Sequence, residues 1–274
     1  MTSPPPILTD TLIHSQIDLN RVETYLFAGG TAAAFTRRSP FKDTVNEDAL
    51  ALIPAGPHAG VLVVADGLGG LPAGETAARL AVQRLAEAVR AAHQDNVALR
   101  DAILNGIEQA NQEIIALGSG SATTLAVVEL QGRLMRSYHV GDSLILVAGQ
   151  RGKLKYQTLP HSPVGYALES GMLDESEAIH HAERNIVSNV IGSPTMRIDI
   201  GPTFALAPRD TLMLASDGAP DNLYISELVD CIRAGPLRRV GRELATRCHE
   251  RMRHPRPGAP SHPDDLSFIL YRSR

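Results

Sequence analysis

Two kinds of apolar pattern alternate along the chain. Short runs rich in β-branched residues end abruptly at polar ones, as residues 61–65 do at Asp66-Gly67 and residues 212–215 do at Ser216-Asp217. Such runs are typical of buried strands. In longer segments the apolar residues recur at helical spacing, which predicts helices over residues 76–92, 97–117, 224–234 and 237–252.

The predicted elements occur in groups. The first two helices follow one another, a hairpin is expected over residues 122–130 and 134–147, and the last two helices precede a final strand at Leu266. Parallel sheets require alternation of strand and helix, whereas grouped strands and grouped helices are typical of antiparallel sheets. The pattern therefore predicts an α+β fold in which helices cover antiparallel sheets.

Weaker signals fill the remaining segments. We expect a strand with a bulge or turn at Gly29-Gly30 within residues 23–36, short helices over 162–170 and 175–182, and a strand over 197–206. No linker or repeat divides the chain, so residues 1–274 are expected to form a single domain. The proline-rich residues 1–20 are expected to form a flexible extension or an extra edge element.

Composition narrows the class of protein. The 274 residues carry a formal net charge of −4, which argues against a general nucleic-acid binder. The N-terminus does not resemble a secretion signal, and no run reaches the ~20 apolar residues of a membrane span. We therefore expect a monomeric cytoplasmic protein without nucleic-acid or membrane partners, in which Cys231 and Cys248 are buried residues of helices.

Carboxylates stand at the ends of five predicted strands. They lie in Asn46-Glu47-Asp48, Asp66-Gly67, Gly141-Asp142, Ser216-Asp217-Gly218 and Asp264-Asp265. One Asp-Gly pair is ordinary turn chemistry, but carboxylates gathered at several strand ends would repel one another. Divalent cations remove this repulsion, and oxygen ligands without neighbouring His or Cys suit Mg²⁺ or Mn²⁺. A pair of such ions can activate water for the hydrolysis of a phosphate ester.

The order of these motifs resembles that of the type-2C metal-dependent Ser/Thr protein phosphatases. The resemblance spans about residues 37–271 and rests on six motifs: Asn46-Glu47-Asp48-Ala49, Asp66-Gly67-Leu68-Gly69-Gly70, Gly120-Ser121-Ala122-Thr123-Thr124, Gly141-Asp142-Ser143, Ser216-Asp217-Gly218-Ala219-Pro220-Asp221 and Asp264-Asp265-Leu266-Ser267. The second motif is similar to that of the bacterial branch. The resemblance implies a sandwich of two antiparallel β-sheets flanked by helices on both sides.

The resemblance also implies roles for individual residues. Asp66 would bridge two tightly bound Mn²⁺ or Mg²⁺ ions, the Gly67 carbonyl would complete one ion, and Asp217 and Asp264 would ligate the other. Asp48 would act directly or through water, Asp142 would support a weaker third ion, and Asp221 would hold waters. The expected activity is hydrolysis of phosphoserine and phosphothreonine on proteins by metal-activated water, with Asp48, Asp66, Asp217 and Asp264 as catalytic residues.

Some positions depart from the family pattern. Asp43 stands where the family has a phosphate-binding Arg. Lys42, Arg37 and Arg38 are the neighbouring candidates for this cation, and we assign the role to Arg38 and Lys42. Asp265 replaces a commoner Asn, which adds charge near the metals. Leu68 replaces the His of eukaryotic members. His139 and His161 are candidates for a substitute general acid, although a single His is more often structural.

Two alternatives to a general phosphatase stay open. One is a pseudophosphatase that binds phosphoprotein without turnover, which the missing Arg favours and the intact carboxylate set disfavours. The other is a regulatory phosphatase dedicated to one partner. Phosphorylated proteins are the expected partners, together with a cognate Ser/Thr kinase. Residues 161–192 resemble the mobile flap of the family.

Overall fold

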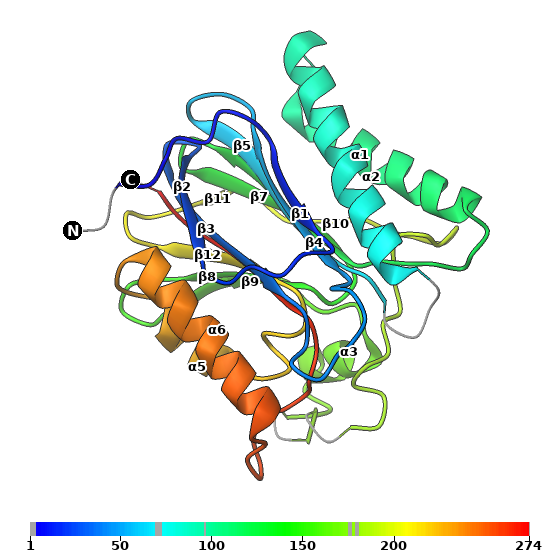
Figure 1. Ribbon diagram of the computed structural model, residues 1–274, viewed down its shortest axis with the longest axis vertical. Coiled ribbons are helices and arrows are strands. Elements are labelled where there is room, and N and C mark those ends of the chain that lie inside the picture. Colours follow the sequence, from blue (N-terminus) through cyan, green and yellow to red (C-terminus); the bar gives the residue numbers. More distant parts are fainter. Residues whose placement is uncertain (1–3, 69–72, 96, 175–176, 179–180, 274) are drawn as a thin grey trace.

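The computed structural model describes residues 4–68, 73–95, 97–174, 177–178 and 181–273. Two antiparallel sheets pack face to face, and a pair of helices covers the outer face of each sheet (Figure 1). The expected α+β sandwich flanked by helices on both sides is confirmed. None of the described helices combines the length and the apolar character that crossing a bilayer requires.

Each sheet is built from strands that lie far apart in the sequence. The first sheet has the order β1 (Leu12–Ser15), β4 (Asp48–Pro54), β5 (Ala59–Asp66), β6 (Leu125–Gln131), β7 (Leu134–Val140) and β10 (Asp199–Ile200), and β11 (Phe204–Ala205) also pairs with β7. The second sheet has the order β2 (Glu23–Phe27), β3 (Gly30–Arg37), β13 (Leu266–Ser273), β12 (Thr211–Ala215), β8 (Leu144–Ala148) and β9 (Leu154–Gln157).

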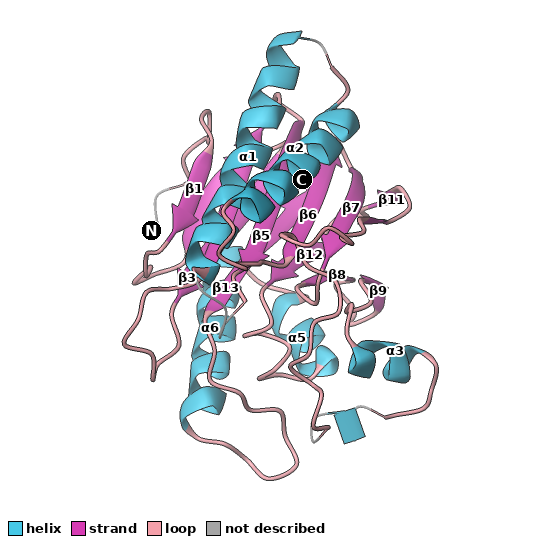
Figure 2. Cartoon of the chain, turned by 90° about the vertical axis from the view of Figure 1, so that its right-hand side faces the viewer, coloured by secondary structure: helices cyan, strands magenta, loops and turns pink. Residues whose placement is uncertain are grey.

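The core has three apolar layers, because alternate residues of a strand point to opposite faces. Leu50, Leu62 and Ile269 are fully buried between the two sheets. Ala51 and Val63 face the other way and pack against α1 (Gly74–Asp95) and α2 (Leu99–Ala116), which lie across the first sheet in Figure 2. The corresponding outer layer of the second sheet is covered by α5 (Ile225–Ile232) and α6 (Leu237–Arg253), which bury Cys231 and Cys248.

The ends of the chain and its turns agree with several expectations. Within residues 1–20, β1 is an edge strand that pairs with β4. The turn at Gly29 separates β2 from β3, and Gly29 has a positive φ of 74°. The short helix α3 (Pro163–Glu169) lies beyond the ends of the sheets in Figure 2, and the Ser162 hydroxyl caps it by accepting the Gly165 N–H at 2.9 Å. The expected helix over 175–182 falls partly outside the described residues.

Two strand predictions were wrong. Residues 134–147 do not form one strand, because the chain turns at Gly141 and passes from β7 of the first sheet to β8 of the second. Gly141 has a φ of 103°, and a Cβ atom there would lie 2.6 Å from the Thr124 Cβ. Residues 197–206 form two short strands, β10 and β11, rather than one. Pro202 lies between them and has no N–H for a sheet ladder.

Candidate metal centre

Five aspartates from separate strand ends meet at one end of the sandwich. Asp48 begins β4, Asp66 ends β5, and the two are direct partners in the strand pairing. Asp217 follows β12, and its backbone N–H points to Asp66 Oδ2 at 3.4 Å. The charges of Asp142 and Asp264 act on both Asp66 and Asp217, so these carboxylates belong to the same cluster. The structure thus brings together all five carboxylates assigned from the sequence.

Burial and mutual repulsion raise the pKa of the Asp48, Asp66, Asp142 and Asp217 carboxyl groups. Burial first, and then the charge of Asp265, raise the pKa of Asp48 to about 8. Burial and the charge of Asp221 raise that of Asp142 to about 7. The pKa values of Asp66 and Asp217 also lie well above the ordinary range, with burial as the largest cause. A bound cation would reverse these shifts, because it favours the charged form of each carboxyl.

Two carboxylate oxygens of the cluster have no hydrogen-bond partner. Asp48 Oδ1 and Asp217 Oδ1 are both buried, and neither meets a donor among the residues that the structure describes. A buried, unpartnered carboxylate oxygen is costly unless a cation or a proton accompanies it. The cluster supplies only oxygen ligands, which are the donors that Mg²⁺ and Mn²⁺ prefer. The residues present therefore fit a hard divalent cation.

The backbone beside Asp66 is tightly held. Thr124 N–H and the Thr123 hydroxyl both donate to the Asp66 carbonyl at 2.8 Å. The hydroxyls of Thr124 and Ser143 lie 2.6 Å apart, which ties this strand end to the turn that carries Asp142. A Cβ atom on Gly67 would lie 2.3 Å from the Gly74 carbonyl oxygen, so only glycine fits there. The Thr pair therefore has a structural role, because it anchors this end of β5.

Ser216 connects the two sheets at the cluster. Its hydroxyl donates to Asp48 Oδ2 at 2.8 Å and accepts the Ser267 N–H at 3.0 Å. Asp48 is thereby fixed through one oxygen while the other, Oδ1, is left for a cation. Sequence reasoning did not assign this role to Ser216, although the residue directly precedes Asp217 in a recognised motif.

The loop between β3 and β4 is organised by Asp265. This buried carboxylate accepts the Ser39 N–H at 2.8 Å, the Glu47 N–H at 2.7 Å and Lys42 Nζ at 2.7 Å. Lys42 Nζ also pairs with Glu47. Both carboxylates raise the pKa of Lys42.

Arg38 lies at a more exposed position of the same loop. Its side chain pairs with Asp18 at 3.1 Å and donates to the Thr44 carbonyl at 3.1 Å. Of the two cations assigned to phosphate, Lys42 is the one whose partner, Asp265, also accepts the N–H of Glu47, the residue before Asp48.

A cavity of about 690 Å³ adjoins the aspartates. It is lined by residues of α3, by the segment before α5 and by the turns that carry Asp142 and Asp217. Asp142, Asp217 and Asp221 are among the residues that line it. His262 Nδ1 lies 3.6 Å from Asp264 Oδ2 and 3.8 Å from Asp221 Oδ2, and the Asp264 carboxylate raises the pKa of His262. Sequence reasoning missed His262, because its only signal was its position two residues before Asp264.

Known proteins share this fold and these motifs. The protein phosphatase 2C family profile matches residues 39–253. The chain belongs to the protein phosphatase 2C family. Protein phosphatase PhpP of Streptococcus pneumoniae is 34% identical over 180 residues, which cover 63% of this chain and 72% of PhpP. The crystal structure of the serine/threonine phosphatase Stp1 from Staphylococcus aureus aligns with a TM-score of 0.76 and 25% identity, over 89% of this chain and 94% of Stp1.

A second similar structure shows the fold with metal bound. It is the catalytic domain of the serine/threonine protein phosphatase PstP in complex with two manganese ions. The TM-score is 0.67 and the identity 21%, over 88% of this chain and 96% of that domain. The protein phosphatase 2C family is metal-dependent.

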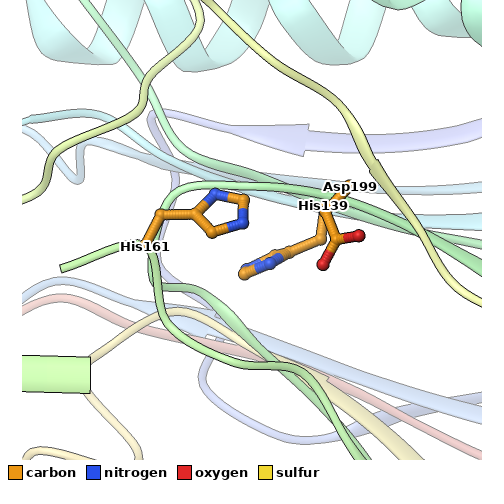
Figure 3. A group of neighbouring side chains, drawn as sticks. All are labelled: His139, His161 and Asp199. Carbon is orange, nitrogen blue, oxygen red and sulfur yellow. The ribbon is translucent and has the colours of Figure 1, made fainter. Parts of the chain in front are cut away.

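A group of three further side chains lies close together: His139, His161 and Asp199 (Figure 3). One ligand atom from each lies within 4.8 Å of the others, and the two rings are 4.8 Å apart. Burial, with the neighbouring His161, lowers the pKa of His139 to about 3, and burial also lowers that of His161. Both rings are therefore neutral at pH 7, which favours the structural interpretation over a general-acid role.

Proposed function

We propose that this protein phosphatase 2C hydrolyses phosphoserine and phosphothreonine in proteins, using two Mn²⁺ or Mg²⁺ ions held by the aspartate cluster. The observation that carries the proposal is the convergence of five aspartates, together with the raised pKa values of Asp48, Asp66, Asp142 and Asp217 and two unpartnered buried oxygens. Phosphoproteins are the substrates that its relatives' names imply. Bound ions of this kind would neutralise phosphate charge and lower the pKa of water, as required for ester hydrolysis.

The residues divide the work of holding the ions. Asp66 is central, because the charges of Asp48, Asp142 and Asp264 all act on it, and we assign it the bridging position. The Gly67 carbonyl would complete one ion, Asp217 and Asp264 would hold the other, and Asp48 would bind directly or through water. Asp142 lies beside Asp221 and would hold a third, weaker ion.

Lys42 is the better candidate for binding the phosphate group. A lysine ammonium has three N–H donors, and two of them meet Asp265 and Glu47. The third would be the donor to a phosphate oxygen. Arg38, the second candidate, would have to leave Asp18 to reach one.

The wider setting is also part of the proposal. We assign the protein to the cytoplasm as a monomer, opposed by a Ser/Thr kinase that phosphorylates the same substrates, without nucleic-acid or membrane partners.

One assay tests the central claim. Hydrolysis of p-nitrophenyl phosphate and of a phosphothreonine peptide is measured with Mn²⁺, with Mg²⁺ and with excess chelator. Turnover that needs the metal supports the proposal. Peptide binding without turnover at saturating Mn²⁺ would instead identify a pseudophosphatase.

A further inference from the structure

His161 joins three segments that are distant in the sequence. Its N–H donates to the Gly141 carbonyl at 2.8 Å, and the Gly141 N–H donates back to its ring Nδ1 at 3.1 Å. At the other end of the 161–192 segment, Ser188 donates both its N–H and its hydroxyl to the His161 carbonyl at 2.8 Å. Asn189 Nδ2 lies 2.9 Å from the same ring nitrogen, Nδ1.

These contacts fix the tautomer of the His161 ring. The side chain of Asn189 is oriented by the backbone of Arg197, which donates its N–H to Asn189 Oδ1 at 3.0 Å and accepts Nδ2 at 2.7 Å. Asn189 therefore presents an N–H to His161, as Gly141 does. Nδ1 faces two donors, so it must be the unprotonated nitrogen, and the proton of the neutral ring sits on Nε2.

This tautomer disfavours a metal site at His139, His161 and Asp199. In Figure 3 one nitrogen of His161 points toward the His139 ring, and the hydrogen bonds identify the other, distant one as Nδ1. A metal on Nε2 would require a proton on Nδ1, where it would oppose two N–H groups. Ligating histidines normally donate their second N–H to an oxygen, as His139 does to the Ser143 carbonyl at 2.7 Å. The His161 ring therefore acts as a hydrogen-bond acceptor for Gly141 and Asn189 rather than as a metal ligand.

We propose that His161 is a positioning residue that latches both ends of the segment 162–187 to the Gly141 turn through its Nδ1 atom and its backbone carbonyl. The inference rests on the proposed function, because α3 and the residues that follow it up to Asp174 line the cavity next to the aspartates. Val164, Leu168 and Leu173 line the cavity, and so do Asp142 and Asp217. A phosphopeptide in the cavity would contact both groups of residues, so its affinity depends on how they are held relative to each other.

The packing of α3 against the residues beside His161 leaves little room for α3 to move independently of His161. The helix begins at Pro163, two residues after His161, and a Cβ atom on Gly165 would lie 2.4 Å from the Pro160 carbonyl oxygen. A shift of His161 would therefore be passed directly to the cavity wall.

Two substitutions separate the ring nitrogens of His161. His161→Asn places an amide oxygen where Nδ1 lies, so an acceptor remains for Gly141 and Asn189. His161→Gln places its amide near Nε2 and removes that acceptor. Asn189→Ala removes one donor and keeps the ring. His254→Gln, at an exposed position after α6, is the matched control.

The variants are compared as full-length protein with Mn²⁺ and a phosphothreonine peptide. We expect His161→Gln and Asn189→Ala to raise the KM for the peptide about tenfold while kcat falls by less than about threefold, the signature of lost binding. His161→Asn and the His254→Gln control should stay within about threefold of the unsubstituted protein in both constants. Equal loss in His161→Asn and His161→Gln, or an unchanged KM in both His161→Gln and Asn189→Ala, would overturn the proposal.

Amide hydrogen exchange of the metal-free protein supplies a readout that does not need activity. Exchange over α3 should be faster in His161→Gln than in His161→Asn, at equal melting temperature of the sandwich. If the unsubstituted protein proves inactive, the proposed function fails but this measurement still decides the latch. Equal exchange in the two variants would overturn it.

Discussion

Asp48 and Asp66 are directly opposite each other at the last position of the β4–β5 pairing. Every other pair in this ladder is apolar, or a Pro with a Gly. Like charges directly opposite in a sheet are destabilising, and both groups are removed from much of the solvent. The strand register itself therefore creates a position where two carboxylates are stable only with protons or with a cation.

Replacing one aspartate of the cluster by the neutral Asn should lower activity and raise the stability of the metal-free protein. We expect Asp66→Asn, and likewise Asp217→Asn, to lower Mn²⁺-dependent turnover at least about a hundred-fold, because each removes a ligand charge. In metal-free buffer at pH 8 the same variants should melt at a higher temperature than the unsubstituted protein, since one repelling charge is gone. Asp230→Asn is the control, because its side chain is 70% exposed on α5. Near-normal turnover of either variant at saturating metal would contradict the assignment.

The metal-free protein should lose stability as pH rises from about 6.5 to 8. Asp48 and Asp142 have pKa values raised to about 8 and about 7, so the folded state binds protons that the unfolded state, with ordinary values near 3.8, has released. Each such group changes the unfolding free energy by up to ~1.4 kcal/mol per pH unit in this window.

Buried histidines act in the opposite direction but at lower pH. Burial lowers the pKa of His139 to about 3 and that of His249 to about 4, so their protonation favours the unfolded state only below the ordinary value of 6.5. Urea unfolding at several pH values above 6.5 therefore reports the carboxylates together with His262, whose pKa Asp264 raises and whose deprotonation lowers stability in the same direction. With millimolar Mn²⁺ the downward slope should vanish and the stability should rise with metal concentration. Identical slopes with Mn²⁺ and with chelator would argue against a metal site.

Lys42 and Asp265 should be strongly coupled in stability. Lys42→Met leaves the buried Asp265 without its cation and should cost about 3 kcal/mol of unfolding free energy. Asp265→Asn turns an amide toward the donors of Lys42 and Glu47 and is also destabilising. We expect the double variant to cost less than the sum of the two. Lys153→Met, at an exposed position, is the control for loss of a lysine. Additive effects of the two substitutions would show that the ion pair contributes nothing of its own.

Inhibition by inorganic phosphate tests the second role of Lys42. The Ki for phosphate should rise about tenfold in Lys42→Met and change by less than about twofold in Arg38→Met, consistent with one lost charged hydrogen bond. The reverse order would assign the phosphate to Arg38.

Asp142 is expected to matter for turnover more than for tight metal binding. Asp142→Ala should keep two tightly bound Mn²⁺ ions by calorimetry and lose at least about tenfold in peptide turnover, because only the weaker third position loses its ligand. If Asp142 merely stabilised its turn, the variant would instead lose roughly 1 kcal/mol of stability and keep normal turnover. Metal stoichiometry, melting temperature and rate measured on one preparation distinguish the two outcomes.

Much of the fold could be predicted because its signals are local. Helical spacing marked α1, α2, α5 and α6, and apolar runs ending at aspartates marked β5 and β12. The change of sheet at Gly141 could not be predicted, because the polar turn Gly141-Asp142-Ser143 marks where a strand ends but not to which sheet the next strand belongs. The pairing of Lys42 with Asp265 depends on contacts across 223 positions, which no local pattern reports.

The three-residue connection from β7 to β8 has a mechanical consequence. Asp142 sits in the middle of a link that is anchored in both sheets, whereas Asp66 belongs to the first sheet and Asp217 to the second. Any sliding of one sheet over the other stretches or relaxes this link and moves Asp142 relative to both neighbours. The affinity of an ion at Asp142 would then depend on the relative position of the two sheets. A substitution between the sheets, such as at Leu62, would therefore change the metal affinity at Asp142.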